Sequence, residues 1–260
     1  MHDAIIDIKG LSKSFGGVLA IDGLSLSIRR GRLTGIIGAN GAGKTTLLNL
    51  ICGVFKASSG SIHVDGQDIS GLKPHELAQR GITRSFQNLQ IFGDMTALEN
   101  VLIAVQSRYL KNYLRLALPL KSVRANEKKW HSDALQWLAL VGLESVADRE
   151  AKSLPYGLLK RLELARAIAL EPKCILLDEP AAGCNSTEAN KLMDVIRSIA
   201  VRGVTVVLVE HNMKVVMNLC EEVFVLDRGR LLCSGTPDTV GSDLRVVSAY
   251  LGSTNWDEAK

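Results

Sequence analysis

Features that would place this chain in several classes of protein are missing from its sequence. It has no apolar run approaching the roughly 18 residues needed to cross a bilayer, and residues 1–10 lack the basic start and long apolar stretch of a secretory signal peptide. Its five cysteines form no C-x-x-C pair and have no histidines at zinc-binding spacing, which favours buried free thiols over disulfides or a zinc site. No internal repeat or low-complexity linker is present. We therefore expect a cytoplasmic protein that could still dock onto a membrane protein.

The composition is that of an ordinary globular protein. Of the 260 residues, 47% are apolar and 22% are charged, which suits one large α/β domain or one domain with a subdomain. The net charge of +4 comes from lysines and arginines that are spread along the chain. A slightly basic, solvated surface explains this distribution better than a nucleic-acid site does.

The hydrophobic pattern of the first 81 residues predicts the start of an α/β core. Residues 3–30 contain short apolar segments broken by glycines, which predict antiparallel strands. Residues 33–38 predict a buried strand, and the apolar segment 44–55 predicts a helix after it. A short strand with a turn is expected at 61–66. A helix is expected at 73–81, with proline at its start and glycine past its end.

From about residue 93 to 170 the pattern is mostly helical, and we interpret this region as a subdomain inserted into the core. Thr96 and Glu99 have the spacing of a helix capping box. In residues 124–143 a helical period places four apolar side chains on one face: Trp130, Ala134, Leu138 and Val141.

The α/β pattern surrounds this helical region on both sides. A short strand, 83–88, comes before it. After it, strands are expected at 174–178, 204–211 and 222–227, with a helix at 186–200 between the first two.

Residues 38–46, GANGAGKTT, predict a phosphate-binding loop. They fit G-x-x-x-x-G-K-[ST] and lie between a predicted strand and a predicted helix. The glycines let backbone N–H groups converge on phosphate oxygens. Lys44 is expected to bridge the β- and γ-phosphates, and the Thr45 hydroxyl to bind Mg²⁺. A glycine-rich turn without a ligand is the alternative, which the strand–loop–helix context disfavours. The cofactor-binding residues predicted here are Gly38, Asn40, Gly41, Gly43, Lys44, Thr45 and Thr46.

Other chemically active side chains end predicted core strands. Asp178 and Glu179 close one strand, His211 closes another, and Gln87 closes the short strand before the helical region. Asp178 suits the surroundings of Mg²⁺, and Glu179 is placed to polarise an attacking water. Because ligands of open α/β sheets bind at strand ends, we expect these groups to form one site. His211 taken alone would be interpreted as an ordinary surface histidine.

A P-loop by itself does not distinguish kinases, GTPases and motor-type ATPases. A GTPase would carry N-K-x-D to recognise guanine, and NKLM at 190–193 lacks the aspartate. The acids Asp178 and Glu179, with Gln87 and His211, are the features that distinguish among these classes of P-loop protein.

In this order the motifs resemble the ATP-binding subunits of ABC transporters over essentially the whole chain. Between Gln87 and the acidic pair lies the place of the signature, residues 154–158, and after the pair comes a D-loop, AAGCN at 181–185. The stretch PYG..KRLELARA followed by LLDEPAAG.N is most similar to the ATPase of branched-chain amino acid importers. That subtype also has an enlarged helical region after the glutamine.

The resemblance implies a role for each matching residue. Phe15 matches the aromatic that stacks on adenine, with a core phenylalanine as the alternative. Glu179 becomes the catalytic base, and His211 and Gln87 position the γ-phosphate and water. The implied magnesium-binding residues are Thr45, Gln87 and Asp178. Gly157, in the signature, would help to cap the γ-phosphate of ATP bound to the opposite subunit.

Three residues depart from the family pattern. Pro155 stands where the signature usually has serine, so a hydroxyl and an N–H are missing. Leu158 replaces a polar residue, and Cys184 stands where the D-loop usually has leucine. Leu158 is the more unusual departure. It would either weaken this half of an ATP site or only pack against the partner.

The resemblance implies an α/β P-loop (RecA-like) ABC ATPase, residues 1–260, with an antiparallel β subdomain and the helical subdomain inserted at about 93–170. Two such subunits would enclose two ATP molecules and drive transmembrane permease subunits that import branched-chain or other hydrophobic amino acids. The chain is then expected at the cytoplasmic face of the inner membrane. The second ATPase subunit would be a different chain, with a homodimer as the alternative, and no nucleic acid would take part.

Rival interpretations remain. One is the ATPase of another ABC transporter, such as a lipopolysaccharide exporter. A soluble ABC ATPase acting on DNA or ribosomes usually has a long coiled-coil insertion or two ATPase domains, and the sequence has neither. An ATP binder without turnover is disfavoured by the presence of Glu179 and His211.

Overall fold

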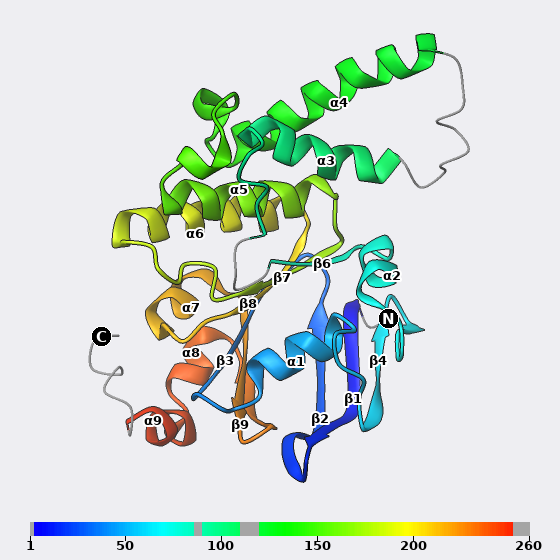
Figure 1. Cartoon of the computed structure of the whole chain (residues 1–260). Coiled ribbons are helices and arrows are strands. Elements are labelled where there is room, and N and C mark those ends of the chain that lie inside the picture. The colour runs from blue at the N-terminus through cyan, green and yellow to red at the C-terminus, as the bar shows by residue number, and fades with distance from the viewer. Residues whose placement is uncertain (1–2, 86–89, 110–119, 252–260) are drawn as a thin grey trace. The chain divides into compact units, whose positions relative to one another are not determined.

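The computed structural model describes residues 3–85, 90–109 and 120–251 and divides into two compact units. The first unit is made of Met1–Arg84, Lys173–Glu179 and Ile196–Lys260. The second is made of Ser85–Pro172 and Pro180–Val195. The chain therefore passes from the first unit to the second and back twice, as the colours of the ribbon trace in Figure 1.

The first unit contains a four-stranded antiparallel sheet, in line with the strands predicted for residues 3–30. Its first two strands form a hairpin in which Phe15 pairs with Val18 across a two-glycine turn. In spatial order the strands are β2 (Val18–Arg29), β1 (Ala4–Phe15), β4 (Ser59–Val64) and β5 (Gln67–Asp68).

A six-stranded sheet forms the centre of the same unit. All its neighbouring strands run parallel except β10, which is antiparallel to β9. Strands β3, β7 and β8 are buried at every residue, which is typical of parallel strands covered on both faces. Their carboxyl ends lie at one edge of the sheet. The spatial order is β10 (Arg230–Gly235), β9 (Glu222–Asp227), β3 (Leu33–Gly38), β8 (Thr205–Val209), β7 (Cys174–Asp178) and β6 (Ile82–Arg84).

Helix α1 (Lys44–Ile51) follows β3 directly and packs against β2, β3 and β7 (Figure 1). It is shorter than the predicted segment 44–55, because the chain turns at Gly53, where φ is +69°. The N–H of Val54 then bonds back to the carbonyl of Asn49. The other helices wholly in this unit are α2 (Pro74–Gln79), α7 (Met213–Leu219), α8 (Pro237–Gly241) and α9 (Leu244–Leu251).

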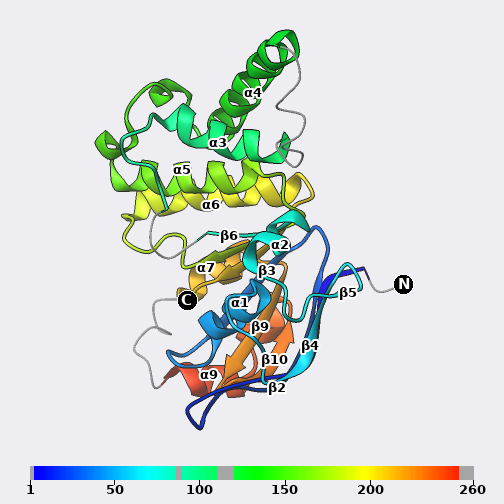
Figure 2. The ribbon, with the colours of Figure 1, turned by 45° about the vertical axis from the view of Figure 1, so that its right-hand side comes forward.

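The second unit is helical. Helices α3 (Ala97–Tyr109), α4 (Leu120–Leu140) and α5 (Tyr156–Ala169) pack on one another (Figure 2). Helix α6 (Ser186–Val201) begins in this unit, and 3₁₀ turns occupy Glu144–Val146 and Ala151–Ser153.

Two local predictions for this region are confirmed. The Thr96 hydroxyl accepts the N–H of Glu99, and the Glu99 carboxylate accepts the N–H of Thr96, which is the capping box. Ala134, Leu138 and Val141 are fully buried, whereas Trp130 is only partly buried.

Other predictions differ from the structure. Strand β6 ends at Arg84, so it does not extend over 83–88 as predicted. Gln87, which was expected to end this strand, lies outside the described residues. Strands β5 and β10 and helices α7, α8 and α9 were not predicted, and β10 is a half-exposed edge strand without a regular apolar pattern.

Candidate nucleotide-binding site

The loop between β3 and α1 has a backbone that only glycine can supply at its last position before the helix. Gly43 has φ of +101°, and a Cβ added there would lie 2.6 Å from the carbonyl oxygen of Ala20. Gly43 is also the N-cap of α1, so no side chain of its own caps the helix, and the first turn contains no acid. The first N–H groups of a helix have no partner within it and favour an anion. The loop therefore fits a phosphate group.

Lys44 is held with its ammonium group inside this loop. Its Nζ donates to the carbonyls of Gly38, at 2.7 Å, and Ala39, at 3.1 Å. Burial lowers the pKa of Lys44, and the nearby carboxylates of Glu179 and Asp178 act in the opposite direction. A buried cation bonded to neutral carbonyls is well placed to receive an anion.

The remaining predicted loop residues are more accessible. Asn40, Gly41 and Thr45 are exposed, and Thr46 is partly buried. The Thr45 hydroxyl and the Asp178 carboxylate offer the hard oxygen ligands that Mg²⁺ prefers. These residues therefore fit a phosphate-bound magnesium ion in their chemistry.

Asp178 is the buried end of β7 and forms an ion pair. Arg84 Nη2 lies 2.8 Å from Asp178 Oδ2, and the two side chains are 8% and 4% exposed. Burial raises the pKa of Asp178, as does the charge of Glu179, whereas Arg84 and Lys44 lower it. The guanidinium is thus the direct hydrogen-bonding partner that stabilises this carboxylate as an anion.

Glu179 and His211 come together at the ends of neighbouring strands. Glu179 has φ of +46°, a conformation that costs energy for a residue with a side chain. Its N–H donates to the carbonyl oxygen of Val209 at 2.9 Å. His211 Nδ1 lies 3.5 Å from Glu179 Oε1, and the imidazole is half exposed. The Glu210 carboxylate is also close, at 4.0 Å from the same nitrogen. The predicted strand-end residues Lys44, Asp178, Glu179 and His211 therefore gather in the first unit.

Phe15 lies on the other sheet of this unit, at the end of β1. It is 41% exposed, which argues against a core phenylalanine. Phe55 meets it edge to face with ring centroids 5.1 Å apart, and the Lys13 ammonium is 4.8 Å from its ring centroid. A half-exposed ring held in this way can stack on a planar ligand.

The signature residues belong to the second unit, where a D-loop residue bonds to them. Helix α5 begins at Tyr156 with Pro155 as its N-cap, and the Tyr156 hydroxyl lies 3.3 Å from the carbonyl of Ala182. A Cβ on Gly157 would lie 2.5 Å from Cδ of Glu188. Glycine at 157 therefore leaves room for the Glu188 side chain, in addition to any role toward phosphate.

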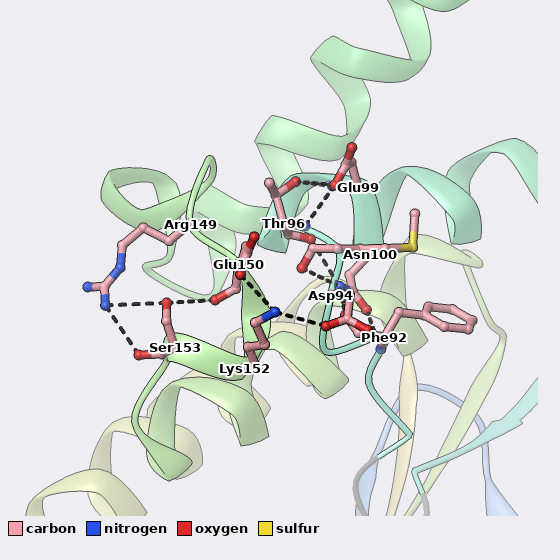
Figure 3. Close-up of polar contacts among 10 residues, drawn as sticks. Phe92, Asp94, Thr96, Glu99, Asn100, Arg149, Glu150, Lys152 and Ser153 are labelled. Carbon is pink, nitrogen blue, oxygen red and sulfur yellow. Dashed lines mark hydrogen bonds and ion pairs between the residues drawn. The ribbon is translucent and has the colours of Figure 1, made fainter.

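A loop ahead of α3 is fixed by a fully buried amide (Figure 3). The Asn100 side chain donates to the carbonyls of Phe92, at 2.9 Å, and Thr96, at 3.0 Å, and accepts the N–H of Phe92 at 3.0 Å. Lys152 adds an ion pair to Asp94 at 2.9 Å. Phe92 remains 48% exposed. We call residues 92–96 the Phe92 loop.

Sequence reasoning missed Arg84 and Glu188 as parts of these sites, and it gave no separate role to Tyr156 within the signature. The spacing of Asn185 and Glu188 is that of a capping box, a signal that was readable. No sequence signal marks Arg84, because its importance comes from burial beside Asp178.

Comparison with known proteins assigns the family. The family model described as ABC transporter matches residues 21–182. The chain belongs to the ABC transporter family. It is an ATPase of the ABC type, since the family's ATP-binding cassettes bind and hydrolyse ATP.

Similar ABC ATPases are found among bacteria and archaea. The high-affinity branched-chain amino acid transport ATP-binding protein BraF of Pseudomonas aeruginosa is 38% identical over 97% of this chain and 99% of its own length. LivG of Escherichia coli, named for the same transport, is 35% identical with the same coverage. A probable LivG of Methanocaldococcus jannaschii is 32% identical over 95% of this chain and 97% of its own length.

Solved structures agree with this ABC ATPase fold. The ADP conformation of an ATP-binding cassette of an ABC transporter has a TM-score of 0.81 and 33% identity, covering 96% of this chain and 99% of that one. A dimeric cassette in a post-hydrolysis state, bound to ADP and phosphate, has a TM-score of 0.74 and 26% identity over 89% and 98% of the two chains. Among the helices that the structure describes, none is long and apolar enough to cross a membrane.

Proposed function

We propose that this chain is the ATP-hydrolysing subunit of an importer for branched-chain or other hydrophobic amino acids. It would be held at the cytoplasmic face of the inner membrane by transmembrane permease subunits. The substrate class rests on the relatives, which are 35–38% identical over nearly the whole chain and carry that transport in their names.

The observation that carries the ATPase mechanism is the gathering of Lys44, Asp178, Glu179 and His211 in one unit. Glu179 accepts the proton of the attacking water, and the backbone geometry that fixes its N–H to Val209 directs its side chain toward His211. His211 donates a hydrogen bond to the γ-phosphate. The role of Gln87, to orient the same water, belongs to the proposal as well.

Lys44 and the loop backbone bind the phosphates of ATP, and Phe15 stacks on its adenine. Thr45, Asp178 and Gln87 would hold Mg²⁺, which when bound would neutralise charge that develops on the β- and γ-phosphates. A mostly phosphate-bound magnesium needs only one or two protein carboxylates, so a single buried Asp178 suits it.

A second ABC ATPase subunit completes each ATP site in this proposal. The start of α5, with the N–H of Gly157, would cap the γ-phosphate of ATP bound to that partner. The partner would be a different chain rather than a copy of this one.

The Phe92 loop is the proposed contact with the permease. A half-exposed aromatic ring on a loop fixed by Asn100 can insert into a partner without losing much conformational entropy. The Arg166 guanidinium stacks at 4.8 Å from the Phe92 ring centroid and adds a cation beside it.

The test uses the chain assembled with permease subunits from the same operon in vesicles. Glu179→Gln should keep ATP binding, stop hydrolysis and stop ATP-driven uptake of leucine, because an amide cannot accept the water proton. Cysteine at position 92 should crosslink to the permease, whereas cysteine at exposed Val18 should not. Uptake or export of a lipid instead of leucine would refute the substrate, and normal turnover by Glu179→Gln would refute the base.

A further inference from the structure

Arg84 joins three elements of the first unit: β6, β7 and α1. It is the last residue of β6, and one arm of its guanidinium bonds Asp178 at the end of β7. The other arm donates to the side-chain oxygen of Asn49 on α1. A planar guanidinium can hold two acceptors at a fixed angle, which an ammonium cannot do.

The hydrogen bond from Arg84 to Asn49 relates Asp178 to helix α1, because of where Asn49 lies on that helix. Asn49 lies four residues after Thr45, so the two side chains share one face of the helix. Arg84 thus fixes the carboxylate of Asp178 relative to the helix face that presents the Thr45 hydroxyl. Among the described residues, Thr45 and Asp178 are the two that hold the magnesium ion in the proposed function.

Asp178 is buried, so its position depends on the partner that it contacts. Its side chain is 4% exposed, and a buried carboxylate needs a hydrogen-bonding partner within the protein. Lys44 is close, yet the hydrogen bonds described for its ammonium go to the carbonyls of Gly38 and Ala39. The direct contact with Asp178 is made by Arg84.

We propose that Arg84 is a positioning residue for the magnesium ion of the ATP complex, acting through Asp178 and Asn49. This inference rests on the proposed function, in which Asp178 serves the metal. A purely structural role would be a buried ion pair that stabilises the fold and leaves metal binding unchanged once the protein is folded.

The experiment measures Mn²⁺, a spectroscopic substitute for Mg²⁺, by electron paramagnetic resonance. All variants carry Glu179→Gln, so that ATP is bound but not consumed. Arg84→Met should weaken Mn²⁺ binding to the ATP complex about tenfold or more, because a charge-assisted hydrogen bond to Asp178 is lost. ATP binding in EDTA, where no metal takes part, should stay within about threefold of the parent, since phosphate contacts come from the loop and Lys44.

Two further variants keep the inference testable if Arg84→Met does not fold. Arg84→Lys retains the charge without the two-armed contact, and Asn49→Ala retains both charges and removes one anchor. Each should give a smaller loss of Mn²⁺ affinity than Arg84→Met. Arg30→Met is the matched control, because it breaks an ion pair with Asp65 in the same unit but away from the loop, and should leave Mn²⁺ affinity unchanged.

The outcomes separate this inference from the proposed function. Parent-like Mn²⁺ affinity in every folded Arg84 and Asn49 variant would overturn it. Asp178→Asn is the reference for the metal role itself. Loss of Mn²⁺ affinity in Asp178→Asn with no loss in the Arg84 variants would leave the proposed function standing and remove Arg84 from it. Unchanged affinity in Asp178→Asn would refute the metal role of Asp178 and this inference with it.

Discussion

Replacing Gly157 with alanine tests why the signature has glycine at the start of α5. The added Cβ would lie 2.5 Å from Cδ and 2.6 Å from Oε1 of Glu188, closer than real contacts allow. The Glu188 carboxylate would have to move. It cannot move freely, because Glu188 Oε2 accepts the N–H of Asn185 at 3.1 Å as half of the capping box of α6.

The magnitude follows from two opposing effects. Losing a helix cap costs about 0.5–2 kcal/mol, and replacing a helical glycine with alanine gains up to about 1 kcal/mol. Gly157→Ala should therefore leave the stability of the parent unchanged or lower it by about 1 kcal/mol. In a Glu188→Ala background the clash is absent, and the same substitution should stabilise by about 0.5–1 kcal/mol. The effect therefore changes from neutral or destabilising in the parent to stabilising in the Glu188→Ala background.

The assay is a double-mutant cycle of thermal unfolding without nucleotide. A coupling of about 0.5–2 kcal/mol corresponds to a shift of about 1–8 °C in Tm for a chain of this size. Equal effects of Gly157→Ala in the two backgrounds would show that Glu188 does not fill the space beside Gly157. The ATPase activity of the parent, the two single variants and the double variant, each assembled with its partner, also distinguishes a packing role of Gly157 from a role in phosphate binding. Recovery of ATPase activity in the double variant indicates packing, and a folded but inactive double variant indicates close approach of phosphate.

Three other predictions concern separate features. Lys44→Ala should lose ATP binding at physiological salt, because the phosphates lose their main cationic side chain, and unchanged affinity in a fluorescence titration would contradict the site. Leu158→Gln should raise single-site turnover at the partner's site by about ten- to hundredfold if a missing hydrogen bond limits it, and equal parent rates at both sites would argue that nothing is missing. Lys173 and then Arg30 hold the pKa of Asp65 below its usual value, so Asp65 stabilises the fold at neutral pH and loses this effect as the pH falls through that lowered pKa. Asp65→Asn should therefore lower Tm at pH 7, and its Tm deficit should shrink as the pH falls below about 4.

The sequence could place most residues of the candidate site in the first unit, because local backbone brings them to the ends of buried strands. A glycine loop between a buried strand and a helix has few alternatives. Glu179 directly follows a buried strand, and Lys44 and His211 come within six residues of one. The strand order could not be obtained this way. Nor could Arg84, since a single arginine in a three-residue strand carries no periodic pattern, and its value arises only when β6 pairs with β7.

Gly157 shows a different limit of sequence reasoning. A motif comparison gives this glycine a role toward phosphate, whereas the structure adds a contact with Glu188, thirty-one residues further along the chain. Contacts between α5 and the start of α6 depend on how the second unit packs. Side-chain identity alone could not reveal that one glycine serves two requirements.

The backbone N–H groups in the first turn of α5 differ in whether they have an acceptor within the helix. The N–H groups of Leu158 and Leu159 both donate to the carbonyl of Pro155, at 2.9 and 3.1 Å. The N–H groups of Tyr156 and Gly157 therefore remain as the first-turn donors without an intrahelical partner. If this turn binds a γ-phosphate, it binds through these two donors and the helix dipole, and a proline at 155 removes no donor that the turn itself requires.

The direction of those donors then depends on residues outside the signature. Tyr156 is tied to the carbonyl of Ala182 through its hydroxyl, and Gly157 is in contact with Glu188, so both positions that supply an N–H are fixed by the segment 182–188. Pro155 and Leu158 have no comparable tie to that segment among the contacts described. It follows that changes at 155 and 158 should be tolerated better than changes at Tyr156 or Glu188. A signature that departs from its family at 155 and 158 can keep its function, provided that the segment 182–188 still contacts the start of α5.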